Sequence, residues 1–362
     1  MKVVLVTNTR TPYRDPVYAL LDQFEDNDVT VLYCAQYEPN RKLWDLESPS
    51  FKHVFLKENF NTKKGSGYVH NNTDVWKHLK EIKPDVVVTT GFNPTFLYAW
   101  LFTLLHRKKH ITLFDDWLFT QASLTFLHKI VRKIVFTFSH AFVGPGIKTA
   151  QLYKSYGIKS DRIFFSHLCA NRNVFTLNKS FEERNYDLMF SGRFHEDKLP
   201  FFFADVANGV KKHIPNLKVL VLGSGPEKDA FLKKLDNYGI DYDYPGFIQP
   251  NLLPNYYSDA RLFLFTTRFD PWGVVGNEAL ASGTPVLTTN YAGVADDLVK
   301  QDVNGYVLDV DVQTWVDRAV ALLQNQEKWQ QLSHASLESL NEYNYENAAA
   351  GLKKACEYAY LH

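Results

Sequence analysis

Cysteine and methionine are scarce in this chain of 362 residues, which holds three of the first and two of the second. Cys34, Cys169 and Cys356 stand far apart, so they form neither a disulfide framework nor the paired spacing of a zinc site. We therefore expect a reducing, cytoplasmic setting. An excess of one charge is lacking too, because 40 Lys plus Arg balance 40 Asp plus Glu. This balance gives no electrostatic reason to expect a nucleic acid partner.

Long apolar runs are also missing. No uncharged apolar stretch reaches the roughly 18 residues of a membrane-spanning helix, and the N-terminal run is too short for a signal peptide. The first predicted strand, Val3–Val6, is not followed by Gly-X-Gly-X-X-Gly. This absence argues against a nicotinamide or flavin enzyme. The length suits two domains of about 150–200 residues each.

The most informative stretch present is 262–289, which reads as strand, loop, helix, turn and strand. The spacing predicts a buried parallel strand over 262–266, a helix over 274–282 and a second strand over 286–288. Backbone N–H groups of Gly273, Val274 and Val275 would open this helix, and a helix N-terminus is a natural site for a diphosphate. Glu278, inside the helix, can accept two hydrogen bonds from a vicinal diol such as a ribose.

This stretch resembles the signature of family-4 retaining glycosyltransferases of the GT-B fold. The signature has an acid, seven residues, a Glu, and then a small-residue segment ending in Gly-X-Pro-Val. Asp270 stands where the family usually has Glu, so the charge is kept on a side chain one methylene shorter. The resemblance implies that Asp270 holds hydroxyls of the donor sugar and that Glu278 holds the ribose.

Further family motifs lie between 186 and 248. Gly192 and Arg193 follow a predicted strand, and Lys198 comes five residues after Arg193. In the family, the Arg and Lys grip the donor diphosphate, where two fixed cations stabilise the charge that builds as the sugar leaves. The alternative for both is ordinary surface charge. The resemblance also implies donor-binding positions at three further residues, which are Gly223, Phe247 and Ile248.

In the N-terminal half, two loops are candidates for the acceptor side. Arg14 lies in the loop after the first strand, which resembles one branch of the family; the alternative is a surface Arg paired with Asp15. Asp115 and Asp116 follow the predicted strand 111–114, at the place where many relatives have a His. Either acid would orient the acceptor hydroxyl or the donor sugar, or it would cap the following helix.

The segment 124–138 has apolar residues at helical spacing with a basic stripe beside them. A basic amphipathic helix can lie on an anionic membrane surface. The alternative is a helix that packs on the core with a solvated basic face. We expect a cytoplasmic protein in either case, and a peripheral one on the cytoplasmic membrane face in the first.

The predicted architecture is therefore α/β, of GT-B type, with two Rossmann-like doubly wound domains facing a cleft. The acceptor-binding domain is expected over 1–175, a linker over 176–185, the nucleotide-sugar domain over 186–345, and a helix that crosses back to the first domain over 346–362. The specific motifs lie between 186 and 345; over 1–175 the resemblance rests on strand–helix order and one loop.

The resemblance implies transfer of a sugar, with retention, from a nucleotide-diphosphate sugar to an acceptor hydroxyl. We expect a glycan or lipid-linked glycan of cell-surface polysaccharide synthesis as acceptor, and no cofactor or metal. Asp241–Asp243 and Asp309–Asp311 have Asp-X-Asp spacing but are interpreted as loop acids. The alternatives are a nucleotide-sugar epimerase on the same fold and a non-catalytic nucleotide-binding subunit; a phosphorylase would need a cofactor-bearing Lys motif that the sequence does not supply.

Overall fold

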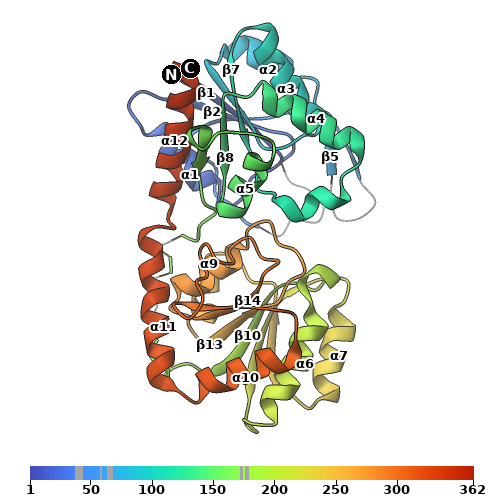
Figure 1. Ribbon diagram of the computed structural model, residues 1–362, viewed down its shortest axis with the longest axis vertical. Coiled ribbons are helices and arrows are strands. Elements are labelled where there is room, and N and C mark those ends of the chain that lie inside the picture. The colour runs from blue at the N-terminus through green and yellow to red at the C-terminus, as the bar shows by residue number, and fades with distance from the viewer. Residues whose placement is uncertain (37–43, 58, 63–67, 172–173, 176–178) are drawn as a thin grey trace. The chain divides into compact units, whose positions relative to one another are not determined.

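The computed structural model describes residues 1–362 except 37–43, 58, 63–67, 172–173 and 176–178 (Figure 1). The chain divides into two compact units. Unit 1 comprises Met1–Leu168 together with Tyr345–His362, and unit 2 comprises Cys169–Asn344. The first boundary thus precedes the predicted one at 175. Of the predicted linker 176–185, residues 176–178 lie outside the described residues, and the remainder belongs to unit 2.

Unit 1 is a doubly wound parallel α/β unit, as predicted. Within its described residues, a seven-stranded parallel sheet has the order β3-β2-β1-β6-β7-β8-β9, and β4 and β5 form a separate antiparallel pair. The strands are β1 (Lys2–Thr7), β2 (Asp28–Tyr33), β3 (Lys52–Phe55), β4 (Phe60–Thr62), β5 (Tyr68–His70), β6 (Val86–Thr89), β7 (Lys109–Leu113), β8 (Ala141–Gly144) and β9 (Ile163–Phe165). The helices are α1 (Asp15–Asp22), α2 (Val75–Ile82), α3 (Pro94–Leu105), α4 (Phe126–Thr137), α5 (Ile147–Ser155) and α12 (Tyr345–Leu361), with short 3-10 helices η2 (Leu118–Ser123) and η3 (Ser160–Arg162).

Unit 2 repeats this plan with a six-stranded parallel sheet of order β12-β11-β10-β13-β14-β15 in its described residues. Its strands are β10 (Tyr186–Arg193), β11 (Lys218–Ser224), β12 (Asp241–Gly246), β13 (Ala260–Phe265), β14 (Val286–Thr289) and β15 (Gly305–Leu308). Its helices are α6 (Pro200–Lys211), α7 (Lys228–Asn237), α8 (Leu253–Tyr257), α9 (Val274–Ala281), α10 (Val312–Leu323) and α11 (Gln326–Glu338), with η4 (Glu196–Lys198) and η5 (Ser339–Asn341).

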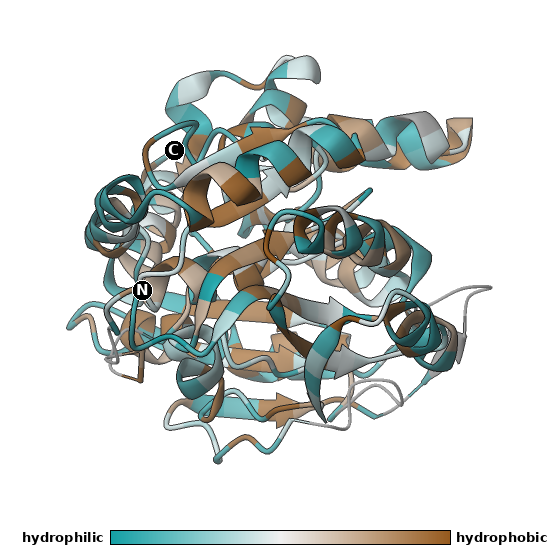
Figure 2. Ribbon diagram, turned by 90° about the horizontal axis from the view of Figure 1, so that it is seen from below, coloured by the Kyte–Doolittle hydropathy of each residue, from teal (hydrophilic) through white to brown (hydrophobic). Residues whose placement is uncertain are grey.

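Apolar strands hold each unit together. β1, β6, β8 and β14 are short apolar or β-branched runs whose residues are almost all buried on both faces, as central strands of a parallel sheet require. Figure 2 shows this concentration of hydrophobic residues along the strands, with hydrophilic residues on the outer helix faces. In unit 2 the aromatic rings of Phe190, Phe203 and Phe231 pack between β10, α6 and α7.

The two Asp-X-Asp pairs, which the sequence predicted to be loop acids, have different positions in the structure. Asp241 and Asp243 lie on the edge strand β12 and not in a loop, and the Asp243 carboxylate accepts a hydrogen bond of 2.5 Å from the Tyr186 hydroxyl. Asp311 caps α10 by accepting from the backbone N–H of Thr314. No helix in the described part of the chain has the length and apolar character needed to cross a membrane.

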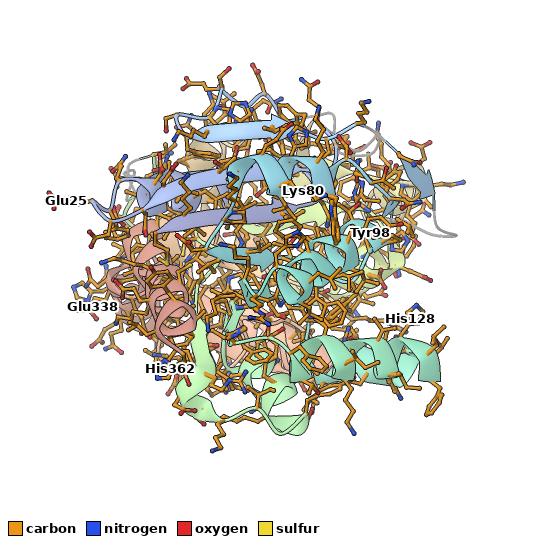
Figure 3. All side chains as sticks on the ribbon, turned by 90° about the horizontal axis from the view of Figure 1, so that it is seen from above. Glu25, Lys80, Tyr98, His128, Glu338 and His362 are labelled. Carbon is orange, nitrogen blue, oxygen red and sulfur yellow. The ribbon has the colours of Figure 1, made fainter. Side chains whose placement is uncertain are left out.

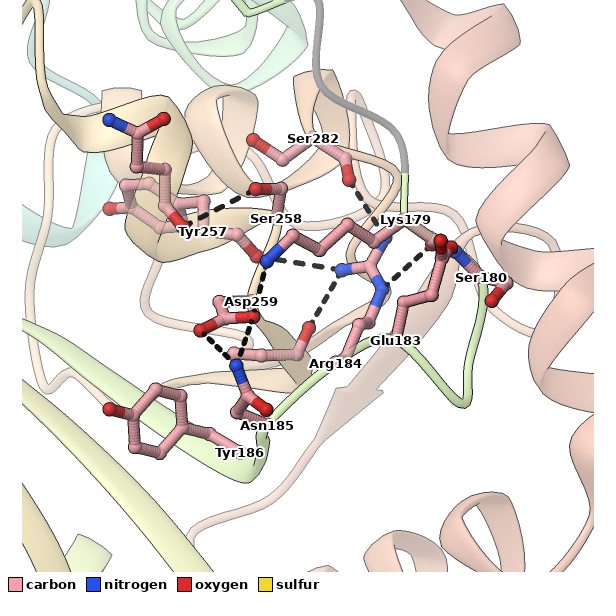
Figure 4. A network of polar contacts seen from close by, with 12 residues as sticks. Lys179, Ser180, Glu183, Arg184, Asn185, Tyr186, Tyr257, Ser258, Asp259 and Ser282 are labelled. Atoms are coloured by element: carbon pink, nitrogen blue, oxygen red, sulfur yellow. Dashed lines mark hydrogen bonds and ion pairs between the residues drawn. The ribbon is translucent and has the colours of Figure 1, made fainter.

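Arg184, inside the predicted linker, is a buried hub of unit 2 (Figure 4). Its guanidinium donates to Ala260 O at 2.8 Å, to Thr284 Oγ1 at 2.6 Å and to Ser282 O at 2.9 Å. It also lies 4.8 Å from the ring centroid of Trp329. Burial lowers the pKa of Arg184 to about 10. The segment before β10 is thus bonded to the turn that ends α9, and it folds as part of unit 2.

We expect Arg184→Met to lower the free energy of unfolding by about 2–4 kcal/mol, because several buried carbonyls lose their donor at once. Chemical denaturation of the whole chain, followed by tryptophan fluorescence, measures this change. Arg268→Met is the matched control, since Arg268 is an exposed arginine of the same unit. Equal stability of the two variants would contradict the assigned role of Arg184.

Candidate functional site

The predicted donor residues of unit 2 gather at the carboxyl edge of its sheet. Strand order runs outward from β10 through β11 to β12 on one side, and from β13 through β14 to β15 on the other. Successive strands are therefore added in opposite directions on the two sides of the β10–β13 pair. Open α/β sheets bind ligands at such a topological switch point. Asp270 and Lys198 lie in the loops that follow these two strands, so they flank the switch point.

The loops after β10 and β13 are bonded to each other. Thr266 Oγ1 donates to Lys198 O at 2.8 Å, and Thr267 Oγ1 donates to Asp197 O at 2.9 Å. The backbone N–H of Arg268 also donates to Asp197 O at 2.7 Å. These bonds fix the two loops relative to each other, and so they preorganise the charged side chains that the loops carry.

Lys198 and Asp270 form an ion pair across this switch point. Lys198 Nζ lies 2.7 Å from Asp270 Oδ2 and donates to Phe269 O at 3.0 Å. The other carboxylate oxygen of Asp270 accepts from the backbone N–H of Trp272 at 3.1 Å. The structure therefore brings the predicted diphosphate cation and the predicted sugar-holding acid together. Each orients the other, and both remain partly accessible to solvent.

Arg193, at the end of β10, is exposed. Within the described residues its guanidinium makes no hydrogen bond or ion pair, which leaves its charge available to an anion. Gly192 precedes it, and a Cβ built on Gly192 would meet no atom within 4 Å. The space next to Gly192, directly beside this cation, is therefore not filled by other protein atoms.

The N-terminus of α9 is shaped by glycine. Gly273 has a φ of 101°, in the left-handed region, and a Cβ there would lie 2.4 Å from the Phe265 ring. Gly293 comes close to the same loop, since its Cβ would lie 2.1 Å from Pro271 O. The first backbone N–H groups of α9, at Val274 and Val275, have no acceptor within the helix. This end of α9 offers donors and a positive dipole beside Asp270.

Glu278 lies one helical turn further along α9 and is partly buried. Desolvation raises the pKa of its carboxyl group to about 7, and a hydrogen bond from the Tyr257 hydroxyl only partly offsets this rise. Tyr257 is buried in α8, and its hydroxyl oxygen lies 3.0 Å from Ser191 Oγ. Sequence reasoning missed Tyr257 and Ser191, because neither belongs to a motif: only the fold brings Tyr257 to Glu278 and Ser191 to Tyr257.

Gly223, Phe247 and Ile248 complete the edge on the β11–β12 side. Gly223 pairs with Gly192 in register and has a φ of 118°. A Cβ on Gly223 would lie 1.9 Å from Gly192 O, so the neighbouring strand alone requires glycine here. Phe247 and Ile248 follow directly after β12, and the Phe247 ring is exposed. An exposed ring at this edge is available for contact with a flat ligand.

In unit 1, Arg14 and Asp115 are brought together although 101 residues separate them. Arg14 Nη2 lies 2.8 Å from Asp115 Oδ1, and Arg14 Nη1 donates to Ser166 O at 3.0 Å. The alternative of a surface pair between Arg14 and Asp15 is wrong, because Arg14 is buried and Asp15 instead pairs with Arg10 at 2.8 Å. Asp115 keeps more than a third of its side chain exposed, so this pair presents a carboxylate at the edge of the sheet.

Asp116 is used differently. It accepts from the backbone N–H of Trp117 at 2.9 Å and from Thr120 Oγ1 at 2.5 Å, and it lies 3.5 Å from Arg132 Nη2. Burial raises the pKa of Asp116, and these donors offset part of the rise. The predicted capping of a helix by Asp116 is not observed, because η2 begins after Trp117 and has no side-chain cap; Asp116 instead bonds to the turn around the start of η2. Of the two acids, Asp115 has the more exposed carboxylate.

The sequence of unit 2 is similar to that of known proteins. Residues 175–338 match the family model of glycosyl transferases group 1. An uncharacterized glycosyltransferase of Methanocaldococcus jannaschii is 27% identical over 141 residues, which are 37% of this chain and 35% of that protein. The 2-deoxystreptamine N-acetyl-D-glucosaminyltransferase of Niallia circulans is 28% identical over 140 residues, or 38% of this chain and 36% of that protein. The chain thus spans about a third of the length of these curated relatives.

Solved structures resemble the chain over its whole length. The crystal structure of Anabaena HepE in complex with UDP has a TM-score of 0.78, covers 99% of this chain and 100% of that chain, and is 13% identical. At this identity the likeness shows the fold alone. The fold is GT-B, with two parallel-sheet α/β units as predicted.

The raised pKa of Glu278 predicts how stability depends on pH. Its carboxyl pKa is about 7 in the folded chain against an ordinary value of 4.5. The folded state therefore holds the proton longer, so stability is lost as pH rises between these values and the full penalty is present above about pH 7. We expect the free energy of unfolding of Glu278→Gln to exceed that of the parent by about 1–2 kcal/mol near pH 8 and to equal it near pH 4.

Urea denaturation of the chain at the two pH values measures this effect. Glu25→Gln, which removes an exposed carboxylate of unit 1, is the control and should change the unfolding free energy little at either pH. A Glu278→Gln protein that is less stable than the parent near pH 8 would show that the carboxylate is stabilising, contrary to this assignment.

Proposed function

Because residues 175–338 match glycosyl transferases group 1, we propose that the chain is a retaining glycosyltransferase that moves a sugar from a nucleotide-diphosphate sugar to an acceptor hydroxyl. The observation that carries the proposal is the set of groups around the switch point of unit 2. An exposed cation, a fixed Lys–Asp pair and a helix N-terminus lie there in one unit, with a partly buried carboxylate one turn along that helix. Each matches a different part of a nucleotide-diphosphate sugar.

The donor would be held in three parts. The ribose diol would donate two hydrogen bonds to Glu278. Burial raises the pKa of Glu278 to about 7, so the neutral carboxyl is common in the free protein. The two hydroxyls of a bound ribose would favour the ionised form. The diphosphate would lie against the N-terminus of α9 and near Arg193 and Lys198. Hydroxyls of the sugar would donate to Asp270.

The chemistry would follow from the same charges. In the transfer step, the bond between the anomeric carbon and the distal phosphate oxygen breaks, and a bond from the acceptor oxygen to that carbon forms on the same face. The acceptor proton passes to the leaving phosphate oxygen. Arg193 and Lys198 stabilise the charge that grows on that phosphate, so we propose that no metal ion is required.

The acceptor would bind to unit 1. The Arg14–Asp115 pair presents a carboxylate that can accept a hydrogen bond from a hydroxyl, and buried Ser166 contacts hold the arginine in place. We propose a glycan or lipid-linked glycan as acceptor, on the cytoplasmic face of the membrane in cell-surface polysaccharide synthesis. The exposed apolar residues of α4 support the lipid-linked form.

Two other functions make different demands on the same site. An epimerase would bind the same donors but return a nucleotide sugar and transfer no sugar to an acceptor. A non-catalytic subunit would bind the nucleotide without releasing it from the sugar. Arg193 and Lys198 would hold the diphosphate in each of these cases, so release of nucleoside diphosphate with transfer of the sugar to an acceptor is what separates a transferase from the other two.

We expect Arg193→Ala to reduce release of nucleoside diphosphate from the donor about a hundredfold to a thousandfold, by analogy with loss of one oxyanion-stabilising donor. The fold should survive, since Arg193 is exposed. A nucleotide-detection assay with a panel of UDP-hexoses, with and without glycan acceptors, measures the release. Lys233→Ala removes an exposed cation of α7 and is the control. Full release by Arg193→Ala would refute its role.

Nucleotide binding is tested by thermal stability in the presence of UDP, GDP, ADP or TDP. At about 100 times its dissociation constant, a ligand should add about 2.7 kcal/mol of stability. Because HepE was crystallised with UDP, we expect UDP to raise the melting temperature. The shift should persist in EDTA if no metal is required. A shift that EDTA abolishes would contradict the metal-free proposal, and no shift with any nucleotide would contradict the donor site.

A further inference from the structure

Helix α4 of unit 1 exposes several apolar side chains and buries an arginine, which is the opposite of an ordinary surface helix. It exposes Phe126 by 80%, Leu127 by 68% and Phe138, just after its last turn, by 53%, while Arg132 is only 5% exposed. A surface helix normally buries its apolar stripe and leaves its arginines in water. Figure 3 shows α4 extending away from the sheet of unit 1, with His128 near its outer end.

The buried arginine fixes this orientation. Arg132 lies 4.7 Å from the ring centroid of Phe114 and 5.1 Å from that of Phe92, and its guanidinium is paired with Asp116. Val135 and Phe136 are buried on the same side of the helix. Because these contacts hold one face of α4 against unit 1, the opposite face is directed to the outside.

The outward face is a continuous apolar stripe. Positions three or four residues apart lie on one side of a helix, and the exposed apolar residues follow this spacing. We call them, with the two exposed lysines beside them, the α4 face; it consists of Phe126, Leu127, Lys129, Ile130, Lys133, Ile134 and Phe138. The preceding 3-10 helix η2 adds two more exposed apolar side chains, Leu118 and Phe119.

The segment that carries this face has charged residues of one sign. The sequence contains no Asp or Glu between Asp116 and Asp161, and it contains six Lys or Arg there, in a chain whose net charge is zero. Lys129 and Lys133 are one helical turn apart and lie beside the apolar stripe. A protein partner would be expected to meet a face of mixed polarity, whereas a stripe of apolar and cationic side chains without acids complements anionic lipid.

We propose that the α4 face docks on the surface of an anionic lipid bilayer, with its apolar side chains among the acyl chains and its lysines at the lipid phosphates. This inference deepens the proposed function only by bringing unit 1 to a lipid-linked acceptor. The docking itself does not depend on glycosyl transfer. In this arrangement the contact between Asp116 and Arg132 would link the membrane-facing helix α4 to the loop that carries Asp115.

The test is flotation of the full chain with vesicles of phosphatidylcholine alone and of phosphatidylcholine mixed with phosphatidylglycerol. We expect binding to the anionic vesicles that weakens as salt is added. Lys129→Glu with Lys133→Glu, and separately Phe126→Ser with Leu127→Ser, should each weaken it at least about tenfold. Lys354→Glu and Leu361→Ser, exposed on α12, are the matched controls and should bind like the parent.

All these positions are exposed, so melting temperatures should confirm that the variants fold. Binding that is absent, that does not prefer the anionic vesicles, or that is unchanged in both double variants would overturn the proposal. Self-association of the parent that Phe126→Ser with Leu127→Ser abolishes, without vesicle binding, would show instead that the face joins copies of the chain. Nucleotide release from a soluble donor, measured without vesicles, should be unchanged in the variants, so a failure of docking is distinct from a failure of the proposed transfer.

Discussion

The ion pair between Lys198 and Asp270 is the contact on which the arrangement of unit 2 turns. It joins the loops after β10 and β13, the two neighbouring strands from which the strand order runs outward in opposite directions. Three further hydrogen bonds from residues 266–268 reinforce the same junction. The ion pair holds opposite charges 2.7 Å apart at the sheet edge, on two loops that these hydrogen bonds also join. An incoming anion and an incoming hydroxyl would therefore meet groups already in place.

Much of unit 2 was predictable because its information is local. The run 262–289 specifies β13, α9 and β14 by hydrophobic pattern and by the Gly and Pro residues that end them, and the structure confirms these elements within a few residues. Arg193, Lys198 and Asp270 follow the carboxyl ends of neighbouring parallel strands, which share one edge, and Lys198 and Asp270 are in contact there. The surroundings of Glu278 were not predictable, because Tyr257 reaches it, and Ser191 reaches Tyr257, through tertiary packing alone.

In unit 1 the sequence predicted less of the side-chain pairing. The sequence placed Arg14, Asp115 and Asp116 at strand ends, but it did not indicate which charges pair. Arg14 bypasses its neighbour Asp15 for Asp115, and Arg132 selects Asp116, because burial depth and ring contacts decide the partner of a long side chain. The same contacts decide which face of α4 is covered. Helical periodicity identified an apolar stripe there, and it favoured the core as the destination of that stripe, whereas much of the stripe is exposed.

Arg184 also determines how this protein can be cut into pieces. A fragment that starts at β10, where the strand pattern begins, would omit the guanidinium that satisfies Ala260 O, Ser282 O and Thr284 Oγ1. Those buried acceptors beside Trp329 would lose the donors that Arg184 supplies. An expression fragment of unit 2 should therefore start near Cys169, and it should stop before Tyr345, whose helix belongs to unit 1. The fragment limits follow from where a buried cation is anchored, and not from where the motifs lie.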